Sequence, residues 1–295
     1  MTRRRSPVIH TFSIVARDPA TGDLGVAVAS KFLAVGMVVP FVRAEIGAVA
    51  TQAFANPSYG PNGLAMMAEG LSAREALRRL LAEDEDRDQR QVGMVDANGM
   101  AASHSGADCP DWAGGRCGEG FACQGNILTG GETLDAMAET FVGATGALPD
   151  RLFAALAAGD TAGGDRRGKQ SAALLVGRKG AGYGGHDDTL VDLRVDDAPE
   201  PLPELGRLLG LHRLYFGVTP AAEKVAIDTA LAREFQAMMN RLGYYDGAID
   251  GGWNDATRSA FRTFIGIENF EERVDIPGRA IDPPALDDLR KRFGA

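Results

Sequence analysis

An apolar hairpin near the amino terminus constrains the fold of this chain more than any other feature. Thr11 to Asp18 (Thr-Phe-Ser-Ile-Val-Ala-Arg-Asp) has the composition of a buried strand, and residues 25–31 (Gly-Val-Ala-Val-Ala-Ser-Lys) have that of a second. Pro-Ala-Thr-Gly lies between them and is a typical turn sequence. The chain therefore begins in antiparallel sheet structure, either as an ordinary sheet edge or as part of a site.

The hairpin also has the geometry that an N-terminal-nucleophile amidohydrolase needs. Thr11 is a small hydroxyl residue that opens a buried strand, and Lys31 arrives on the paired strand. In such enzymes the hydroxyl attacks an amide carbonyl and the α-amine of the same residue takes the proton, while a nearby cation keeps that amine neutral. Ten residues precede Thr11 and would have to be removed before an α-amine exists.

Length and charge narrow the classes of function. The 295 residues suffice for one substantial domain and a smaller one. Forty acidic against 31 basic side chains give a net charge of −9, which disfavours nucleic acid and anionic membranes as partners. The tail of residues 1–10 is too short and polar for a secretion signal, and no stretch approaches the roughly 20 apolar residues of a membrane span. These features predict a cytoplasmic protein.

Three cysteines lie close together at Cys109, Cys117 and Cys123. An odd number suits a reducing compartment better than a disulfide framework. With His104 they could be imagined as a zinc site, but the spacing lacks the closely spaced pair that such sites usually have. We therefore expect small, partly buried thiols, and neither a metal nor another cofactor.

The order of the predicted elements indicates the fold class. The chain shows strands, two helices, strands, two helices and strands, with Asn98-Gly99 as a hairpin turn. We expect strands at 38–42, 46–52, 91–95, 100–103, 121–126, 171–176 and 189–195, helices at 64–81 (with a second start signal at Ser72), 133–141 and 150–158, and a glycine-rich loop at 106–119. This order predicts an α+β fold, a four-layer αββα sandwich of two antiparallel sheets between helical layers.

The chain changes character near residue 197. Three prolines in Asp-Asp-Ala-Pro-Glu-Pro-Leu-Pro indicate a linker, and a helix is expected at 204–215. Apolar stripes at Phe235, Met238, Met239 and Leu242, and at 260–264, then predict a small all-α three-helix module. The expected domains are 11–197 and 221–295, joined by a linker and helix at 198–220.

Several segments of the first domain resemble one known family. TFSIVARD, VAVASKF, ATQAFANPSYGP, CQGN and GDRRGKQSAAL are similar to an uncharacterised bacterial family placed in the Ntn-hydrolase superfamily. The resemblance covers Thr11 to Asp197 and implies that Thr11 is the nucleophile, with Lys31 or Arg43 as the cation beside it. It also implies an oxyanion-binding backbone after Gln52, in the segment with Ala53, Phe54 and Asn56.

The same resemblance implies further polar groups near the nucleophile. Asn126 follows Gly125 before the third helix, and Asp165, Gln170 and Ser171 lead into the last hairpin. Simpler interpretations remain open: Lys31 as a solvated strand end, Asn126 as a helix cap, and Asp165 as an ion-pair partner of Arg166 or Arg167.

Two other motifs are weaker. Residues 163–169 fit a phosphate-loop pattern, but Gln170 stands where magnesium binding needs Ser or Thr, and the segment follows a helix instead of a strand. His186-Asp187-Asp188 could hold a metal at a loop tip, although a solvated turn is the simpler interpretation.

The C-terminal module resembles a peptidoglycan-binding-like domain over Glu234–Tyr244 and residues 246–264. The resemblance implies a sugar or peptide ligand, with Tyr245, Asp250 and Trp253 as candidate contacts. Since no export signal is expected, the module would contact muropeptides, another protein or its own subunits.

The sequence thus supports two hypotheses about function. The first is hydrolysis of a small amide or peptide bond with Thr11 as nucleophile. The alternative is a non-catalytic protein whose loops, including Cys109 to Cys123, bind a ligand or partner. Relatives of this superfamily often assemble, so a homo-oligomer is expected in either case.

Overall fold

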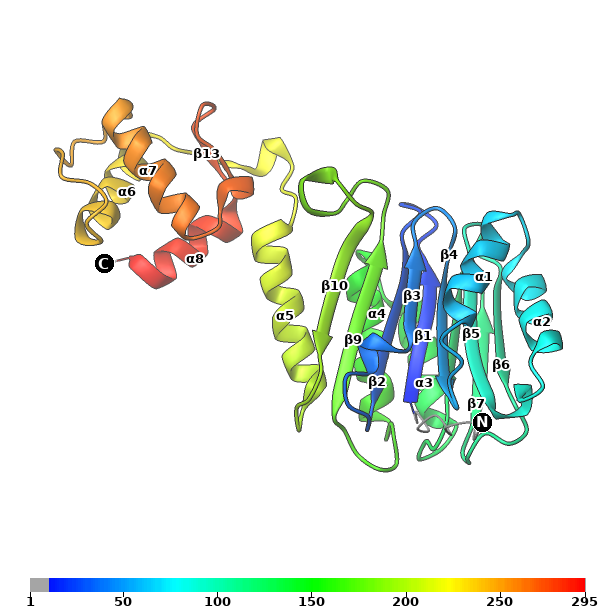
Figure 1. The fold of residues 1–295 in the computed structure, drawn as a ribbon. Coiled ribbons are helices and arrows are strands. Elements are labelled where there is room, and N and C mark those ends of the chain that lie inside the picture. The colour runs from blue at the N-terminus through cyan, green and yellow to red at the C-terminus, as the bar shows by residue number, and fades with distance from the viewer. Residues whose placement is uncertain (1–10, 295) are drawn as a thin grey trace, which may run out of the picture. The chain divides into compact units, whose positions relative to one another are not determined.

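The predicted N-terminal hairpin is formed by β1 (Thr11–Arg17) and β2 (Leu24–Ser30), whose register pairs Thr11 with Ser30. A computed structural model describes residues 11–294 (Figure 1), so the tail expected at residues 1–10 lies outside the described residues. The chain divides into two compact units, Met1–Arg207 and Leu208–Ala295.

The hairpin lies at the centre of a six-stranded antiparallel sheet. Its strand order is β10 (Thr189–Val195), β9 (Ser171–Gly177), β2, β1, β8 (Phe121–Gly125) and β7 (Gly114–Gly118). Because β1 has hydrogen-bonded neighbours on both sides, its backbone groups are paired with β2 and β8.

A second antiparallel sheet has four strands. Its order is β3 (Pro40–Arg43), β4 (Gly47–Ala53), β5 (Arg90–Asp96) and β6 (Ala101–Ser105). The expected Asn98-Gly99 turn joins β5 to β6, and Gly99 has a φ of +85°, a conformation that glycine adopts without strain.

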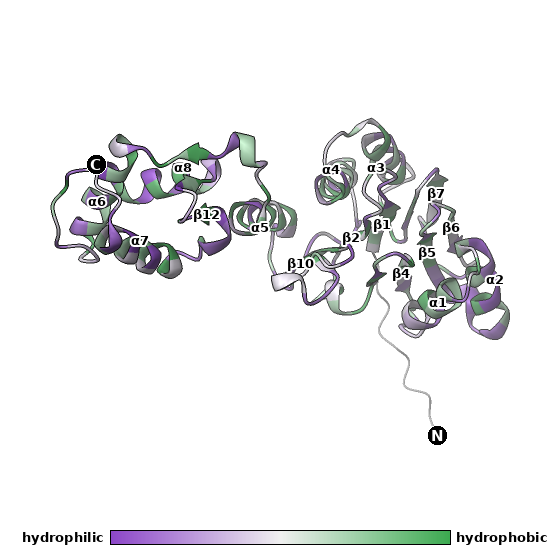
Figure 2. Cartoon of the chain, turned by 90° about the horizontal axis from the view of Figure 1, so that it is seen from above, coloured by the Kyte–Doolittle hydropathy of each residue, from purple (hydrophilic) through white to green (hydrophobic). Residues whose placement is uncertain are grey.

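The two sheets pack face to face, and helices cover their outer faces (Figures 1 and 2). Small and β-branched side chains, such as Val15, Val26 and Ala50, fill the space between the sheets. Helices α1 (Tyr59–Ala68) and α2 (Ala73–Glu83) cover the four-stranded sheet, and α3 (Glu132–Gly143) and α4 (Leu148–Thr161) cover the six-stranded sheet. The expectation of a mixed α and β fold with antiparallel sheets is confirmed.

Two elements differ from the expectation within the first unit. The helical region expected at 64–81 begins earlier, at Tyr59, and it divides at the predicted second start: Gly70, with a φ of +97°, follows the first helix and Ser72 caps the second in a capping box with Glu75. The glycine-rich loop expected at 106–119 contains β7, whose backbone pairs with β8 even though its residues have little intrinsic strand preference.

The proline-rich segment also differs from the expectation. Helix α5 (Pro201–Phe216) begins inside the predicted linker, with Pro201 and Pro203 in its first turn. Proline is tolerated there because the first-turn N–H groups have no partner within the helix. Pro201 and Pro203, which the sequence analysis assigned to a linker, therefore lie at the start of α5.

The C-terminal unit contains the three predicted helices, α6 (Thr229–Arg241), α7 (Asp255–Ile267) and α8 (Pro283–Phe293). The module is not all-α, because a small sheet of two-residue strands, β11 (Val225–Ala226), β13 (Ala280–Ile281) and β12 (Val274–Asp275), accompanies them. Phe235 and Phe261 are fully buried between the helices, with ring centroids 5.1 Å or less from a neighbouring ring. No helix within residues 11–294 has the length and apolar character of a membrane span.

Candidate functional site

The first residue of β1 lies in a row of hydroxyl groups. Thr11 is fully buried, and its Oγ1 donates a hydrogen bond to Ser30 Oγ at 3.2 Å. The sheet register then pairs Ser30 with Ser171 on β9. Three hydroxyl side chains from adjacent strands therefore lie side by side at this end of the sheet.

Strand alternation determines which way Thr11 faces. Ser13 and Val15 point toward the second sheet, where Ser13 bonds to Gln52 and Val15 joins the core between the sheets. Because side chains two residues apart share a face, Thr11 faces the same space, while Phe12 packs toward α4 near Gly159. The candidate nucleophile therefore lies between the sheets.

Three buried glutamines connect the sheets beside Thr11. Ser13 Oγ donates to Gln52 Oε1 at 2.6 Å and accepts from Gln124 Nε2 at 2.6 Å. Gln52 Nε2 donates in turn to the carbonyl of Thr11 at 3.2 Å and to Gln91 Oε1 at 2.8 Å. Strands β1, β4, β5 and β8 are thus tied together through side-chain amides.

Gln91 is the most connected residue of this network. Its Nε2 donates to Ser105 Oγ at 2.7 Å and to the carbonyl of Gly125 at 2.7 Å, and its Oε1 accepts from Asn126 Nδ2 at 2.8 Å. The backbone N–H of Asn126 donates to the Thr11 carbonyl at 3.0 Å. Two hydrogen bonds from this network, from Gln52 Nε2 and from the Asn126 N–H, therefore converge on the Thr11 carbonyl and fix its position.

The structure therefore brings Asn126 to Thr11, as expected from the sequence. Asn126 is buried and lies before the N-cap of α3, Gly131, so the alternative that it caps this helix is wrong. Its contacts join it to the backbone of Thr11 and to Gln91.

The two candidate cations are not hydrogen-bonded to Thr11. Lys31 is exposed, and its Nζ donates to the carbonyl of Lys169 at 3.2 Å, as a solvated strand end would. Arg43 ends β3 opposite Gly47, whereas the Thr11 carbonyl is bound by Gln52 near the other end of β4. The prediction that Arg43 lies beside Thr11 is wrong.

The expected oxyanion segment also departs from its predicted role. Ala53 ends β4 with a φ of +64°, a strained conformation for a residue with a Cβ. The N–H of Phe54 is occupied by the carbonyl of Gln89, at 3.3 Å, and the Asn56 side chain bonds to Ser58 and Asp84. Phe54 and Asn56 are therefore not placed to bind an oxyanion at Thr11.

Asp165 and Ser171 fasten loops near the same end. Asp165 is buried, accepts from the Lys31 N–H at 2.9 Å and forms an ion pair of 2.7 Å with Arg167, which was the simpler interpretation from sequence. Ser171 Oγ donates to the carbonyl of Phe32 at 2.5 Å and accepts from the N–H of Val35 at 3.1 Å. Both side chains organise the loop after β2.

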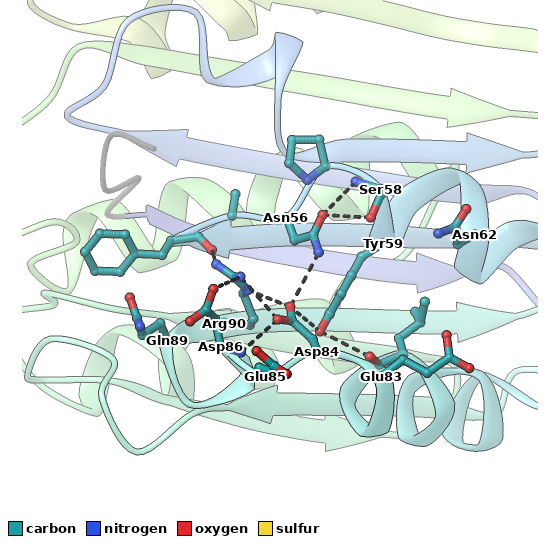
Figure 3. Close-up of a pocket in the computed structure, with 14 residues that line it drawn as sticks. Asn56, Ser58, Tyr59, Asn62, Glu83, Asp84, Glu85, Asp86, Gln89 and Arg90 are labelled. Atoms are coloured by element: carbon teal, nitrogen blue, oxygen red, sulfur yellow. Dashed lines mark hydrogen bonds and ion pairs between the residues drawn. The ribbon is translucent and has the colours of Figure 1, made fainter. Parts of the chain in front are cut away.

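A cleft of about 1070 Å³ opens at the ends of β4 and β5, beside α1 and α2 (Figure 3). It contains Phe54 and Asn56 together with four consecutive acidic residues, 83–86. Asp84 lies at the centre of the hydrogen bonds within the cleft (Figure 3). Its carboxylate accepts from Arg90 Nε at 2.8 Å and from the Tyr59 hydroxyl at 2.9 Å. The sequence analysis did not identify this cleft.

The cleft perturbs two of its titratable groups. Burial alone would raise the pKa of Asp84, but hydrogen bonds from Arg90, the Asp86 N–H and Tyr59 outweigh it and hold that pKa well below its ordinary value. Burial, and then the hydrogen bond and charge of Asp84, raise the pKa of Tyr59 far above its ordinary value. At neutral pH the cleft therefore contains a carboxylate, a guanidinium and a neutral phenol in one bonded group.

The candidate contacts of the C-terminal unit have different environments. Tyr245 is a core residue, 8% exposed, and its hydroxyl donates to the carbonyl of Ala248 at 3.0 Å, so little of its side chain is accessible to a ligand. Asp250 accepts from the N–H of Gly252 at 2.7 Å and from Gln236 Nε2, and these bonds lower its pKa. Trp253 is half-buried and lines a second cleft with Arg258, Arg262 and Arg279.

The cysteines are free thiols in the described chain. Cys109 and Cys123 are buried and Cys117 is exposed. Within residues 11–294 no group of three or more His, Cys, Asp or Glu side chains has the geometry of a metal site. His104 bonds through Nε2 to the carbonyl of Arg87 at 3.1 Å.

The sequence analysis missed the glutamines as site residues. Gln52, Gln91 and Gln124 are each part of an otherwise small or apolar strand sequence, at positions where alternation points the side chain between the sheets. A polar side chain in such a position must be hydrogen-bonded when it is buried. That rule, applied to three strands together, could have identified the network.

Comparisons with known proteins agree with the two-unit organisation. Residues 11–205 match the family described as "Family of unknown function (DUF1028)". Residues 218–286 match the PG_binding_2 family, whose description provisionally assigns peptidoglycan binding. A search of proteins with curated functions found no match.

One solved structure is similar to the N-terminal unit. It is the crystal structure of protein SPO2555 from Silicibacter pomeroyi, itself described as a DUF1028 protein. It is 32% identical, with a TM-score of 0.63, and the match covers 69% of this chain and 89% of that one. The chain therefore belongs to the DUF1028 family and has a C-terminal peptidoglycan-binding-type domain.

Proposed function

We propose that the N-terminal unit is an Ntn-type αββα hydrolase that cleaves a small amide or peptide bond, with Thr11 as its nucleophile. The order of helices, sheet, sheet and helices supports this assignment, as do the sequence segments that resemble the superfamily. The single observation that carries the proposal is the position of Thr11, at the first residue of a central strand, with its carbonyl bound by Asn126 and Gln52.

The chemistry requires that the peptide bond between His10 and Thr11 is first hydrolysed. The new α-amine of Thr11 then accepts the proton of Oγ1 as that oxygen attacks the substrate carbonyl. Collapse of the tetrahedral intermediate releases the amine with that proton, and water hydrolyses the resulting ester. Ser30 Oγ, 3.2 Å from Thr11 Oγ1, orients the hydroxyl in this scheme.

A second function is favoured by the burial of Thr11. In the chain with residues 1–10 attached, Thr11 has no α-amine, and no lysine or arginine of the described chain is hydrogen-bonded to its Oγ1. An unactivated threonine is a poor nucleophile. The same unit would then act as a non-catalytic binding protein, with the cleft beside Asp84 as a candidate site.

Intact mass and N-terminal sequencing distinguish the two functions. A chain that begins at Thr11 after incubation near neutral pH, and that hydrolyses members of an amide and short-peptide panel, supports the hydrolase. Thr11→Ala should abolish that turnover, Thr11→Ser should retain part of it, and Thr161→Ala, an exposed helix threonine, should not change it. A stable unprocessed terminus with no turnover would support the binding function instead.

For the C-terminal unit we propose binding of muropeptide-like fragments. Support comes from the family match and from the cleft around Trp253. Co-sedimentation of the full chain with purified peptidoglycan tests it, and a chain that stays entirely in the supernatant would contradict it.

A further inference from the structure

The cleft beside Trp253 has a distinctive lining. It measures about 380 Å³ and is bounded by Trp253, Arg258, Arg262, Ile276, Pro277 and Arg279. Three of its six residues are arginines, two are apolar and one is aromatic. In a chain with a net charge of −9, this combination forms a local basic pocket with an apolar wall.

Two of the three arginines have no carboxylate partner among the residues that the structure describes. Arg258 donates to the carbonyl of Trp253 at 2.9 Å and forms an ion pair with Asp255. Within residues 11–294 neither Arg262 nor Arg279 forms an ion pair or a side-chain hydrogen bond. Other arginines of the unit are neutralised, in the pairs Arg273–Asp282, Arg290–Glu234 and Arg292–Glu268.

The positions of these arginines are set by the backbone. Arg258 and Arg262 are four residues apart on α7 and so project from the same helix face. Arg279 lies in the turn between β12 and β13 with a φ of +54°, an uncommon conformation for a residue other than glycine. Arg262 and Arg279 thus bring two positive charges without an ion-pair partner among residues 11–294 to one cleft, and an anionic ligand would neutralise them.

The aromatic wall is also held in place. The Trp253 ring packs edge-on against Phe261 with centroids 5.1 Å apart, and the guanidinium of Arg279 lies 5.8 Å from the Trp253 ring. Phe261 is fully buried, so it fixes one side of the indole. A ligand would therefore meet a preformed surface of one ring and two unpaired guanidinium groups.

We infer that this cleft binds a carboxylate-bearing peptidoglycan fragment, with Arg262 and Arg279 on the carboxylate and Trp253 against its sugar or apolar part. Guanidinium groups match the planar fork of a carboxylate with two parallel hydrogen bonds. The volume lies near the lower end of the range for small-molecule sites, about 300–1,000 Å³, which suits a one-sugar or two-residue fragment. The inference rests on the muropeptide binding proposed above. It adds that the ligand binds in the cleft beside Trp253 and that a carboxylate is the group recognised there.

Calorimetric titration of the full chain tests it with three probes. They are muramyl dipeptide, which has a free carboxylate, its methyl ester, and neutral triacetylchitotriose. Muramyl dipeptide should bind at least tenfold more tightly than the ester. Arg262→Gln and Arg279→Gln should each weaken the binding of muramyl dipeptide at least tenfold, and Arg262→Lys should weaken it less. Arg290→Gln is the control: it removes the same charge from an arginine paired with Glu234, and it should leave the affinity unchanged.

The outcomes separate this inference from the function on which it rests. Equal binding of acid and ester, or unchanged affinity in both glutamine variants, would overturn the carboxylate site. If the chain co-sediments with peptidoglycan while the variants bind muramyl dipeptide normally, the module binds cell wall through another surface. Thermal melting of each variant by circular dichroism shows whether a loss of affinity reflects unfolding.

Discussion

Gln52 Nε2 donates a hydrogen bond to the carbonyl oxygen of Thr11 at 3.2 Å, and this contact joins the two sheets at the first residue of β1. Both residues are fully buried. The same amide nitrogen lies 2.8 Å from Gln91 Oε1, so Thr11 is positioned by side chains that come from the opposite sheet. The stability of the unit and the placement of its candidate nucleophile therefore depend on the same network.

Gln91→Leu should lower the free energy of unfolding of the N-terminal unit by about 2–4 kcal/mol. The change removes partners from Gln52, Ser105 and Asn126, and each buried polar group left unpaired costs about 1–3 kcal/mol. Urea titration followed by Trp112 fluorescence, in a Trp253→Phe background, measures this unit alone. Asn62→Ala, at an exposed helix position, is the control, and it should change the free energy of unfolding by no more than about 0.5 kcal/mol. An equally small effect of Gln91→Leu would show that the glutamine network does not stabilise the unit.

Gly93→Ala should destabilise the same unit by about 1–3 kcal/mol through overcrowding. A Cβ at Gly93 would lie 2.0 Å from Gln124 Oε1, and Gln124 cannot move away without breaking its bond to Ser13. Gly143→Ala is the matched control, because a Cβ there meets no atom within 4 Å and alanine is favoured in a helix. Urea midpoints should therefore shift in opposite directions, and a neutral Gly93→Ala would contradict the close packing described here.

The sequence predicted those parts of the fold that local chemistry determines. The hairpin of residues 11–31, the Asn98-Gly99 turn and the Ser72 cap each depend on neighbouring residues, and each is present. β7 and the two-residue strands of the C-terminal unit were missed, because only pairing with a distant strand makes them strands. Local preference carries no information about such partners.

The candidate site was predictable only in part, because most of its contacts join residues that are far apart in the sequence. Asn126 was identified from a resemblance, and its contact with Thr11 is present. Arg43 was misplaced because sequence order does not tell at which end of the sandwich a strand terminates. The acidic cleft was missed because it forms only when α1, α2 and the start of β5 come together in space.

The three thiols should differ in reactivity. Burial raises the pKa of Cys109 to about 11 and also raises that of Cys123, so at pH 8 both remain almost entirely protonated and shielded from reagent. Burial also raises the pKa of Cys117, but its side chain is exposed to the reagent, so it should react first. Mass spectrometry after iodoacetamide treatment should find one labelled site in the folded protein and three in urea. Equal labelling of Cys123 in the folded protein would contradict its burial in β8.

The group around Asp84 should make the N-terminal unit sensitive to acid. The pKa of Asp84 is lower in the folded chain than its ordinary value of 3.8, so its ionised form binds Arg90 and contributes stability above that pH. This contribution should be lost as the pH falls below about 4. In that range Asp84 is protonated in the unfolded chain but still ionised in the folded chain, so each further fall in pH favours the unfolded state. Urea midpoints between pH 7 and pH 3 should fall less steeply in Asp84→Asn than in the unmodified chain. Glu85→Gln removes an equal charge from an exposed position of the same cleft, and an identical flattening in that variant would assign the effect to general charge instead of to the Asp84–Arg90 contact.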